Sequence, residues 1–425
     1  MPATFADMVS AYLLYRIAKE QKFGEKGALL IAGVYAFAAP LLFVSGAWGQ
    51  IDSVLALLIV LVIWLLQRDQ RILAGAVYGI AILMKPQALM FGPILAMAYL
   101  LQIWDDQERW LWRIVETVLA VLAALAALAL LALPFQGTQP WDWLIRKYID
   151  TAGSYDYASI EAFNFASLIG GNWKPSSMLV LGLIPYKTFG MGMIILSVLF
   201  SSALYYFGRK QSKGALYLSG ALVVLLVFTF GHYMHERYML PALMLLMMAY
   251  LYYRDRRLLL VFGAISASAF LNATTAFYIV DHQAARGALY DVITRAGSLV
   301  TVAAAIYLSF VSVQILLLNR SPERLNLAQT KEKRLSRRVS ILPAVETDNK
   351  LHYTRRDIIY VLAITLVYGV VALTNLGSTK APQTYWYSEK AGESVTIQFD
   401  AIEHVSAFSV YGNIDSDGTL LIQTP

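Results

Sequence analysis

Groups that could do chemistry are rare in this chain and fall mainly in four segments. They are WGQIDS at 48–53, KPQ at 85–87, the long stretch 135–187 and GHYMHERY at 231–238. The neighbouring segments are strongly apolar, and ionisable residues in such surroundings are costly and tend to mark functional sites. Their carboxylates, cations and amides could transfer protons, bind anions or hold hydroxyl groups. These segments are therefore the candidate parts of a functional site.

The segment WGQIDS places one carboxylate, Asp52, at the start of an apolar run. Asp52 could simply cap a helix, because a side-chain oxygen there satisfies free backbone N–H groups. It could instead hold a sugar hydroxyl or help to activate an acceptor. In that case Trp48 offers a flat face to a sugar ring, and Gln50 offers an amide for hydrogen bonds.

The segment KPQ lies where one apolar run stops and another starts. A lysine at this place, Lys85, could extend its ammonium to the membrane surface and have no further role. It could also meet a phosphate, as a cation at a helix end would do against a lipid-linked anion. Gln87, two residues further on, is a candidate for substrate binding through its amide.

GHYMHERY gathers His232, His235, Glu236 and Arg237, and it is the hardest cluster to explain as scaffold. A salt-bridged surface loop is one interpretation. A divalent metal site is another, although the metalloprotease motif has its glutamate between histidines four residues apart. The interpretation that suits these residues best is an anion site in which Arg237 and the histidines bind a leaving phosphate and Glu236 orients one of them. We therefore expect no cofactor, with a divalent metal as the alternative.

The long stretch 135–187 has two parts of different character. WDWLIRKYID at 141–150 fits a helix that lies in the membrane surface as an anchor. EAFNFASLIGGNW, further on, offers Asn164 and Asn172 together with two glycines and several aromatic residues. These amides could contact an acceptor or a sugar.

The composition indicates a membrane protein. Hydrophobic residues make up 58% of the 425 and charged residues only 15%, with a mean hydropathy of +0.56, whereas soluble domains are about half apolar. Because apolar runs of about 20 residues recur, we expect an all-α polytopic protein with about twelve transmembrane helices. The expected helices are 4–18, 27–45, 52–67, 71–85, 86–103, 112–134, 188–207, 214–230, 239–253, 258–280, 292–318 and 357–377. The absence of cysteine excludes disulfides and thiolate metal sites.

The basic residues predict an orientation. When alternate loops are assigned to opposite sides of the membrane, most of the 34 Lys and Arg residues fall on one side, as the positive-inside rule expects of the cytoplasm. All four polar segments then lie on the extracytoplasmic face. We predict a multi-pass protein of the cell membrane with its site on that outer face. The net charge of +6 belongs to this pattern and does not indicate nucleic acid.

The sequence suggests four parts. Residues 1–318 form the main transmembrane domain, 319–356 a basic cytoplasmic linker that could also touch anionic lipid, and 357–377 the last transmembrane helix. Residues 378–425 show alternating apolar positions, which predicts the start of a small extracytoplasmic β-domain. A chain that opens on the outer side is expected to lack an upstream helix and its loop, and a few strands alone are unstable. We therefore expect truncation at both ends.

Three of the segments carry a family resemblance. WGQIDS, LMKPQALMFGP and GHYMHERYMLPAL resemble motifs of bacterial mannosyltransferases related to the GPI mannosyltransferases, within the GT-C superfamily. They are more distantly similar to the dolichyl-phosphate-glucose glucosyltransferases of N-glycan assembly, which carry HFQYN, FKQMALYYAP and HVHEK at matching places. The resemblance covers roughly residues 2 to 320 and implies a GT-C-like fold.

The resemblance also implies an activity. It implies inverting transfer of a hexose, mannose in the nearer family, from a polyprenyl phosphate donor to a glycan, lipid or protein acceptor. His235 and Arg237 would neutralise the departing polyprenyl phosphate, with His232 and Lys85 close by. Asp52, with Gln50, would position the sugar or the acceptor.

The catalytic base and the class of function leave alternatives open. In the resembled family the base is an aspartate of the first outer loop, which would precede Pro2 here. Either Asp52 takes its place, or the chain is an inactive fragment. A transporter or flippase of lipid-linked sugars is a second possible function, although such proteins often have internal repeats and none is evident here. A noncatalytic membrane scaffold is a third.

Overall fold

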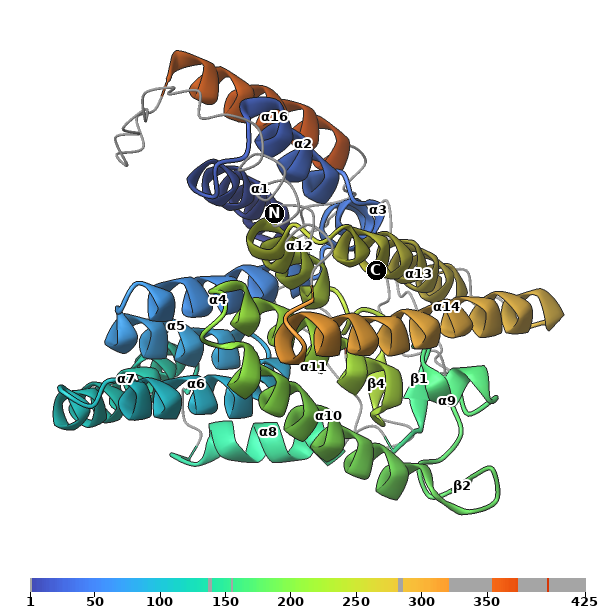
Figure 1. Ribbon diagram of the computed structural model, residues 1–425. Coiled ribbons are helices and arrows are strands. Elements are labelled where there is room, and N and C mark those ends of the chain that lie inside the picture. The colour runs from blue at the N-terminus through green and yellow to red at the C-terminus, as the bar shows by residue number, and fades with distance from the viewer. Residues whose placement is uncertain are drawn as a thin grey trace.

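The structure is a computed structural model that describes residues 2–136, 140–153, 156–281, 286–320 and 354–373, together with residue 396. The described chain is mainly helical, as Figure 1 shows. Apart from residue 396, the predicted β-domain at 378–425 lies outside the described residues, as does most of the predicted linker at 319–356.

The elements are α-helices, short 3-10 and π turns (η), and strands of two residues. In chain order they are α1 (Pro2–Glu20), α2 (Glu25–Ala36), α3 (Ala39–Leu41), η1 (Leu42–Ala47), α4 (Asp52–Gln67), α5 (Arg71–Met84), η2 (Pro86–Phe91), α6 (Gly92–Asp105), α7 (Trp110–Ala132), η3 (Leu133–Phe135), α8 (Trp143–Gly153), β1 (Ser159–Ile160), α9 (Phe165–Leu168), β2 (Leu179–Val180), β3 (Ile184–Pro185), α10 (Tyr186–Gly208), α11 (Gly214–Phe230), β4 (Met234–His235), α12 (Pro241–Tyr253), α13 (Arg256–Asp281), α14 (Ala288–Ser312), η4 (Val313–Leu317) and α16 (Arg355–Leu373). Strand β1 pairs in parallel with β4, and β2 pairs antiparallel with β3.

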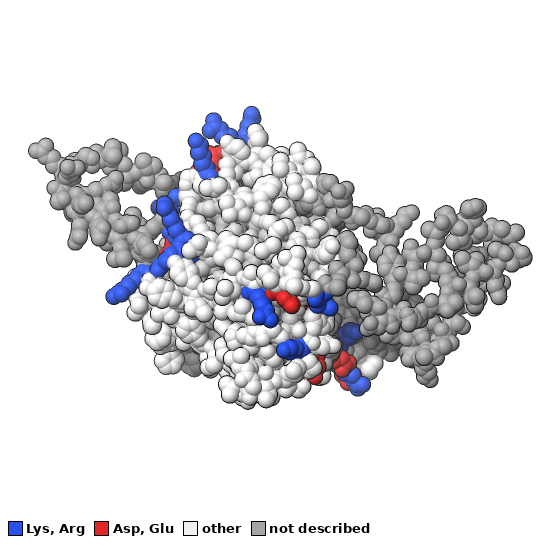
Figure 2. All heavy atoms as spheres, turned by 90° about the vertical axis from the view of Figure 1, so that its right-hand side faces the viewer, with Lys and Arg blue, Asp and Glu red and all other residues white. Residues whose placement is uncertain are grey.

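Several helices are suited to a bilayer by length and composition. Among the described residues, five spans are long and apolar enough to cross one: Pro86–Asp105, Trp110–Phe135, Tyr186–Gly208, Arg256–Val280 and Ala288–Leu317. The bent pair Glu25–Ala36 and Ala39–Ala47 raises this number to six. Figure 2 shows a broad uncharged area between small groups of Lys and Arg. A mainly helical protein with five or six candidate membrane spans is confirmed for the described residues, and twelve spans stay a prediction.

The expected helix over 27–45 is not continuous, which corrects the sequence interpretation. The structure divides it into α2 and the pair α3 and η1, whose axes differ by 45°. Ala38 between them has extended backbone angles. Pro40 follows in the first turn of α3, and proline cannot donate a helical hydrogen bond and clashes with the carbonyl four residues earlier. The apolar run is therefore continuous in sequence but broken in space.

The centre of the fold is the hairpin of α11 and α12, which lies in the middle of Figure 1. Every residue from Gly214 to Thr229 is buried, and so is nearly all of α12. A helix that is apolar on all sides is typical of such an enclosed position. The loop joining the two helices contains GHYMHERY, so the densest part of the packing supports this segment directly.

The basic connections between helices meet at one end of the bundle. Hydrogen bonds and ion pairs that join them are Arg68 to Glu20 at 3.1 Å, Gln67 Nε2 to the Lys213 carbonyl at 2.7 Å, Arg209 to Asp105 at 2.9 Å, and Arg254 to the Gln21 carbonyl. These connections belong to the side predicted to be cytoplasmic. The segments WGQIDS, KPQ and GHYMHERY lie at the opposite ends of the same helices. The orientation of the bundle in a membrane stays a prediction.

Helices α5 and α7 approach each other unusually closely. A Cβ atom added to Gly75 would lie 2.2 Å from the carbonyl oxygen of Ala120, and one added to Gly79 would lie 2.2 Å from that of Ala124. Small residues four apart on both helices let the backbones touch, which is a common way for membrane helices to pack. This contact holds α5, whose last residue precedes Lys85, against its neighbour.

Candidate functional site

Three predicted residues meet where α4 begins, α5 ends and the α11–α12 loop folds back. Lys85 Nζ forms an ion pair with Asp52 Oδ1, and Arg237 Nε lies 3.5 Å from Asp52 Oδ2. Asp52 occupies the first turn of α4, where negative charge is favoured by the helix dipole, and Ile51 rather than Asp52 holds the capping position. One carboxylate thus holds two cations from separate segments.

Two further residues of GHYMHERY extend this arrangement. Arg237 also pairs with Glu236 through Nη1, and His235 Nδ1 lies 3.7 Å from Glu236 Oε2. Burial raises the pKa of Glu236, but the neighbouring His235 imidazole and the charge of Arg237 outweigh it, so the pKa lies below its usual value. Glu236 therefore remains ionised and orients its neighbours. We refer to Asp52, Lys85, His235, Glu236 and Arg237 as the Asp52 cluster.

The Asp52 cluster is layered. The side chains of the two acids are buried, with 0% of Asp52 and 6% of Glu236 exposed. The side chains of Lys85, His235 and Arg237 are 14%, 14% and 21% exposed. The cationic and imidazole groups therefore form the outer layer and the carboxylates the inner one. An approaching anion would meet donors first.

Lys85 is held by more than its ion pair. Burial lowers the pKa of its ammonium from the usual value, and the neighbouring Asp52 carboxylate opposes this by favouring the charged form. The ammonium nitrogen lies 4.8 Å from the centre of the Tyr238 ring, a distance that suits a cation–π contact. Gln87 Nε2 donates a hydrogen bond of 2.6 Å to the Tyr238 carbonyl. Gln87 therefore joins the KPQ segment to GHYMHERY, and Tyr238, the last residue of GHYMHERY, to which the sequence analysis gave no role, belongs to the site.

Trp48 lies beside the Asp52 cluster and supports it. The guanidinium carbon of Arg237 is 5.4 Å from the centre of the indole ring, and the Phe277 ring contacts the same indole in a T-shaped arrangement. The indole therefore has a structural role in supporting Arg237. A sugar could contact only the portion of the indole that these neighbours leave exposed. Gln50 is half-buried, and within the ranges described here its amide has no protein hydrogen bond.

His232 faces a different neighbour. A Cβ atom added to Gly190 of α10 would lie 2.6 Å from the His232 backbone nitrogen, so only glycine allows this close approach. Burial lowers the pKa of His232, and the positive charge of Lys187 lowers it further. The ring therefore favours its neutral form. The contacts described for His232 are with α10 and the neighbouring Tyr233 ring, and none of them joins it to the Asp52 cluster, so its predicted role in substrate binding stays a prediction.

A second buried acid, Glu161, was missed by sequence analysis. Trp173 Nε1 donates to its Oε1 at 2.7 Å, Arg286 Nη2 lies 2.7 Å from the same oxygen, and the Tyr290 hydroxyl donates to Oε2. Asn272 of α13 donates to the Glu161 carbonyl. Glu161 thereby fastens the long loop to α13 and α14.

Glu161 also lies directly beside GHYMHERY. In the parallel pairing of β1 and β4, Ile160 is opposite His235, and Glu161 itself forms an isolated bridge to His235. Glu161 has a left-handed φ of 54°, which few non-glycine residues adopt. The ion pair and hydrogen bonds of the carboxylate stabilise this backbone, and the position of His235 depends on it.

The two asparagines predicted to bind substrate have structural contacts. Asn164 is fully buried, and its Oδ1 accepts a hydrogen bond of 3.0 Å from the Ser167 amide, so it caps α9. Asn172 Oδ1 accepts from the Glu161 amide at 2.9 Å, and Nδ2 donates to the Tyr290 hydroxyl at 2.6 Å. A direct role of either amide in substrate binding stays a prediction.

The metal alternative can be compared with the observed positions. Across the parts of the chain that the structure describes, no three His, Asp or Glu side chains are grouped so that they could hold a metal ion. The two histidines of GHYMHERY face different neighbours, since His235 contacts Glu236 and His232 packs on α10.

Comparison with known proteins adds an independent finding. The sequence model of glycosyltransferase family 87 matches residues 4–229, more than half of the chain. The matched range runs from α1 to α11 and contains Asp52 and Lys85, and it ends just before GHYMHERY. No curated protein matches the chain.

Proposed function

The chain belongs to glycosyltransferase family 87, a GT-C-like family of membrane glycosyltransferases, and from this premise we propose that it transfers a hexose from a polyprenyl phosphate donor to an acceptor on the extracytoplasmic face of the cell membrane. Mannose is the proposed sugar, because the motifs resemble those of mannosyltransferases. The acceptor would be a glycan, a lipid or a protein.

The observation that carries the proposal is the layering of the Asp52 cluster. Lys85 and Arg237 are fixed by the buried Asp52 and lie further out than it does. Preorganised cations stabilise charge that develops on a leaving group, and they need no rearrangement during the reaction. A sugar carried on a lipid phosphate is a substrate whose leaving group has this charge. An arginine and a lysine held in this way would suit it.

In the proposed reaction the acceptor hydroxyl oxygen forms a bond to the anomeric carbon of the donor. The bond between that carbon and the phosphate oxygen breaks, and its electron pair stays on the phosphate, which departs with its lipid. The hydroxyl proton passes to a base. Lys85 and Arg237 would receive the phosphate, and His235, when protonated, would add a third donor. The formal charges of Lys85, Arg237, Asp52 and Glu236 sum to zero, so the phosphate would draw the cations partly away from the acids.

Asp52 would act as a positioning residue in this scheme. Its side chain is fully buried behind Lys85 and Arg237, so an acceptor hydroxyl cannot approach it from outside the Asp52 cluster, although Oδ2 forms no hydrogen bond in the described part of the chain. Its contribution would be to hold Lys85 and Arg237 at one place. The proton acceptor would therefore be a group outside the Asp52 cluster.

The proposal can be tested with membranes that contain the chain and radiolabelled polyprenyl phosphate mannose or glucose. We expect label from mannose to appear in an acceptor, and Lys85→Ala and Arg237→Ala to lower the rate at least about ten-fold, or about 1.4 kcal/mol. The control is Arg146→Ala on α8, which removes an exposed arginine that pairs with Asp142. Equal rates for all three variants and the parent would refute the phosphate role. Transfer from glucose alone would correct the sugar.

A further inference from the structure

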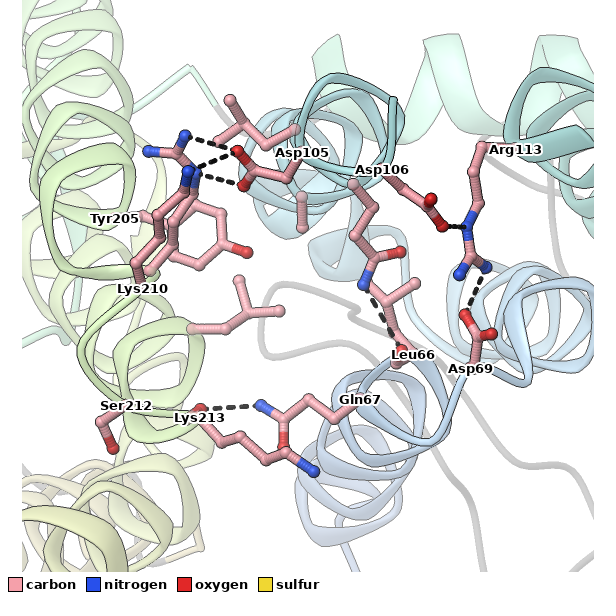
Figure 3. Close-up of a pocket in the computed structure, with 15 residues that line it drawn as sticks. Leu66, Gln67, Asp69, Asp105, Asp106, Arg113, Tyr205, Lys210, Ser212 and Lys213 are labelled. Atoms are coloured by element: carbon pink, nitrogen blue, oxygen red, sulfur yellow. Dashed lines mark hydrogen bonds and ion pairs between the residues drawn. The ribbon is translucent and has the colours of Figure 1, made fainter. Parts of the chain in front are cut away.

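A polar pocket lies at the end of the bundle opposite to the Asp52 cluster. It has a volume of about 380 Å³ and is formed by the last residues of α4, α6 and α10 and the first residues of α7 and α11. Figure 3 shows the hollow with Asp105, Asp106 and Asp69 along one side and Lys210 and Lys213 on another. No part of the proposed glycosyl transfer uses it.

The pocket and the Asp52 cluster share their supporting helices. Helix α4 begins with Asp52 and ends with Gln67 at the pocket. With 16 residues and a rise of about 1.5 Å each, α4 separates the two places by about 24 Å. Helix α11 runs the other way, from the pocket at Lys213 to the loop that contains Arg237. In a membrane the two places would therefore lie near opposite surfaces.

The residues that line the pocket include one more basic than acidic side chain. Asp105 pairs with Arg209 at 2.9 Å and with Lys210 at 3.0 Å. Asp69 and Asp106 both pair with Arg113. The remaining lining cation, Lys213, is exposed, and within the described ranges its ammonium has no carboxylate partner.

Lys213 also stands at a favourable place for an anion. It precedes the first residue of α11, a helix of 17 residues whose positive dipole end points at the pocket rim. Phosphate groups bind readily at such helix ends, and a lysine beside them adds a full charge. The hydroxyl oxygen of the neighbouring Ser212 accepts a hydrogen bond of 3.0 Å from the Gly214 amide at the same rim, so this oxygen caps α11 and only the O–H of Ser212 could face an anion.

The floor of the pocket differs from its rim. Leu66, Ala98, Tyr205 and Leu216 line it from below and are all buried. An apolar floor beneath a charged rim at the ends of membrane-crossing helices suits a ligand that has both characters. We propose that the pocket binds the phosphodiester headgroup of a membrane phospholipid, with the phosphate at Lys213 and the adjoining glycerol and acyl portion on the apolar floor. This inference does not depend on the proposed transfer reaction.

The test is native mass spectrometry of the purified full chain in detergent micelles that contain either phosphatidylglycerol or diacylglycerol, which lacks the phosphate. We expect phosphatidylglycerol to remain bound, diacylglycerol to be absent, and Lys213→Ala or Lys213→Glu to lower the bound fraction at least about five-fold. The matched control is Lys26→Ala, which removes an exposed lysine from the first turn of α2. Far-UV circular dichroism confirms that each variant is folded.

Three outcomes would overturn the proposal. Equal retention by the Lys213 variants and the parent would show that the lysine binds no headgroup. Retention of diacylglycerol to the same extent as phosphatidylglycerol would show that the pocket binds the apolar part of a lipid and does not recognise the phosphate. A third outcome is that millimolar inorganic phosphate displaces the lipid completely and raises the unfolding temperature as much as the lipid does. The pocket would then be a site for a free anion. Sugar transfer is not measured in any of these experiments, so loss of the proposed function would leave their interpretation unchanged.

Discussion

Lys85 and Arg237 approach different oxygens of the Asp52 carboxylate, Lys85 at Oδ1 and Arg237 at Oδ2. The acid is buried, and the two cations reach further towards the surface. Placing two like charges so close together would be unfavourable without the carboxylate between them. Asp52 therefore determines whether both cations can serve one ligand.

The first prediction concerns this carboxylate. Asp52→Asn removes the charge and keeps the shape, so Lys85 and Arg237 should repel each other and separate. We expect a loss of about 3 kcal/mol of stability, as is usual when one partner of a buried pair is removed, and at least about a ten-fold lower transfer rate. Thermal unfolding in detergent and the transfer assay measure the two effects. Asp142→Asn, which removes the partner of Arg146 in an exposed ion pair at the start of α8, is the control and should change neither. An Asp52→Asn variant as active as the parent would contradict the positioning role.

The second prediction concerns pH. Burial lowers the pKa of Lys85, so its ammonium loses its proton at a lower pH than an exposed lysine does. The cationic form exists below that pKa, and transfer should therefore fall as the pH rises through it. Arginine keeps its charge throughout this range. Lys85→Arg should therefore retain a larger share of its own neutral-pH rate at about pH 10. Parallel alkaline decline in parent and variant would show that another group titrates, and Lys187→Arg serves as a control.

The third prediction concerns Glu161, which braces the long loop beside His235. Glu161→Gln cannot neutralise Arg286, although it can still accept hydrogen bonds from Trp173 and Tyr290. We expect a lower unfolding temperature and a rate reduced less than in Arg237→Ala. A variant with both Glu161 and Arg237 substituted separates the two roles. The losses of transfer rate should add if the two residues act independently, and they should not add if both act on the same local structure. An unchanged unfolding temperature in Glu161→Gln would contradict the bracing role.

The fourth prediction concerns helix packing. Gly79→Val would drive a side chain into the backbone of Ala124, so α5 and α7 must separate. Forcing extra carbon atoms into a tight contact typically costs about 1 to 3 kcal/mol, which thermal unfolding should detect. Gly263→Val in α13 provides the control, since nothing lies within 4 Å of a Cβ atom added there. Equal unfolding temperatures for the two variants would show that the close approach is not needed.

Helix positions were the most predictable part of the fold. The bounds 214–230 expected for the central helix are those of α11, because Lys213 and Gly231 border a run without charged residues. The break before Pro40 was missed, because the apolar residues continue across it. Hydropathy does not report a change in the direction of the helix axis. The β-domain expected at 378–425 is not tested, since only residue 396 of it is described.

The predicted site residues differed in how far the sequence could place them. Asp52, Lys85 and Arg237 could be expected near one another, because counting membrane crossings assigns their segments to the same end of the bundle. The pairing of both cations with one carboxylate could not, because side-chain contacts depend on helix rotation. Glu161 gave no signal at all. Its partners lie far along the chain, and its left-handed backbone is unusual for a glutamate.

The enclosure of α11 and α12 has a consequence for biogenesis. Both helices leave the ribosome before α13 and α14, which later pack against them. Until then, acyl chains of the host bilayer must occupy the flanks of this nascent hairpin. Arg286 and Tyr290, which fasten the segment beside GHYMHERY, are translated later still than the hairpin itself. GHYMHERY, the loop of the hairpin that packs at the centre of the fold, is thus among the last segments to reach its mature form.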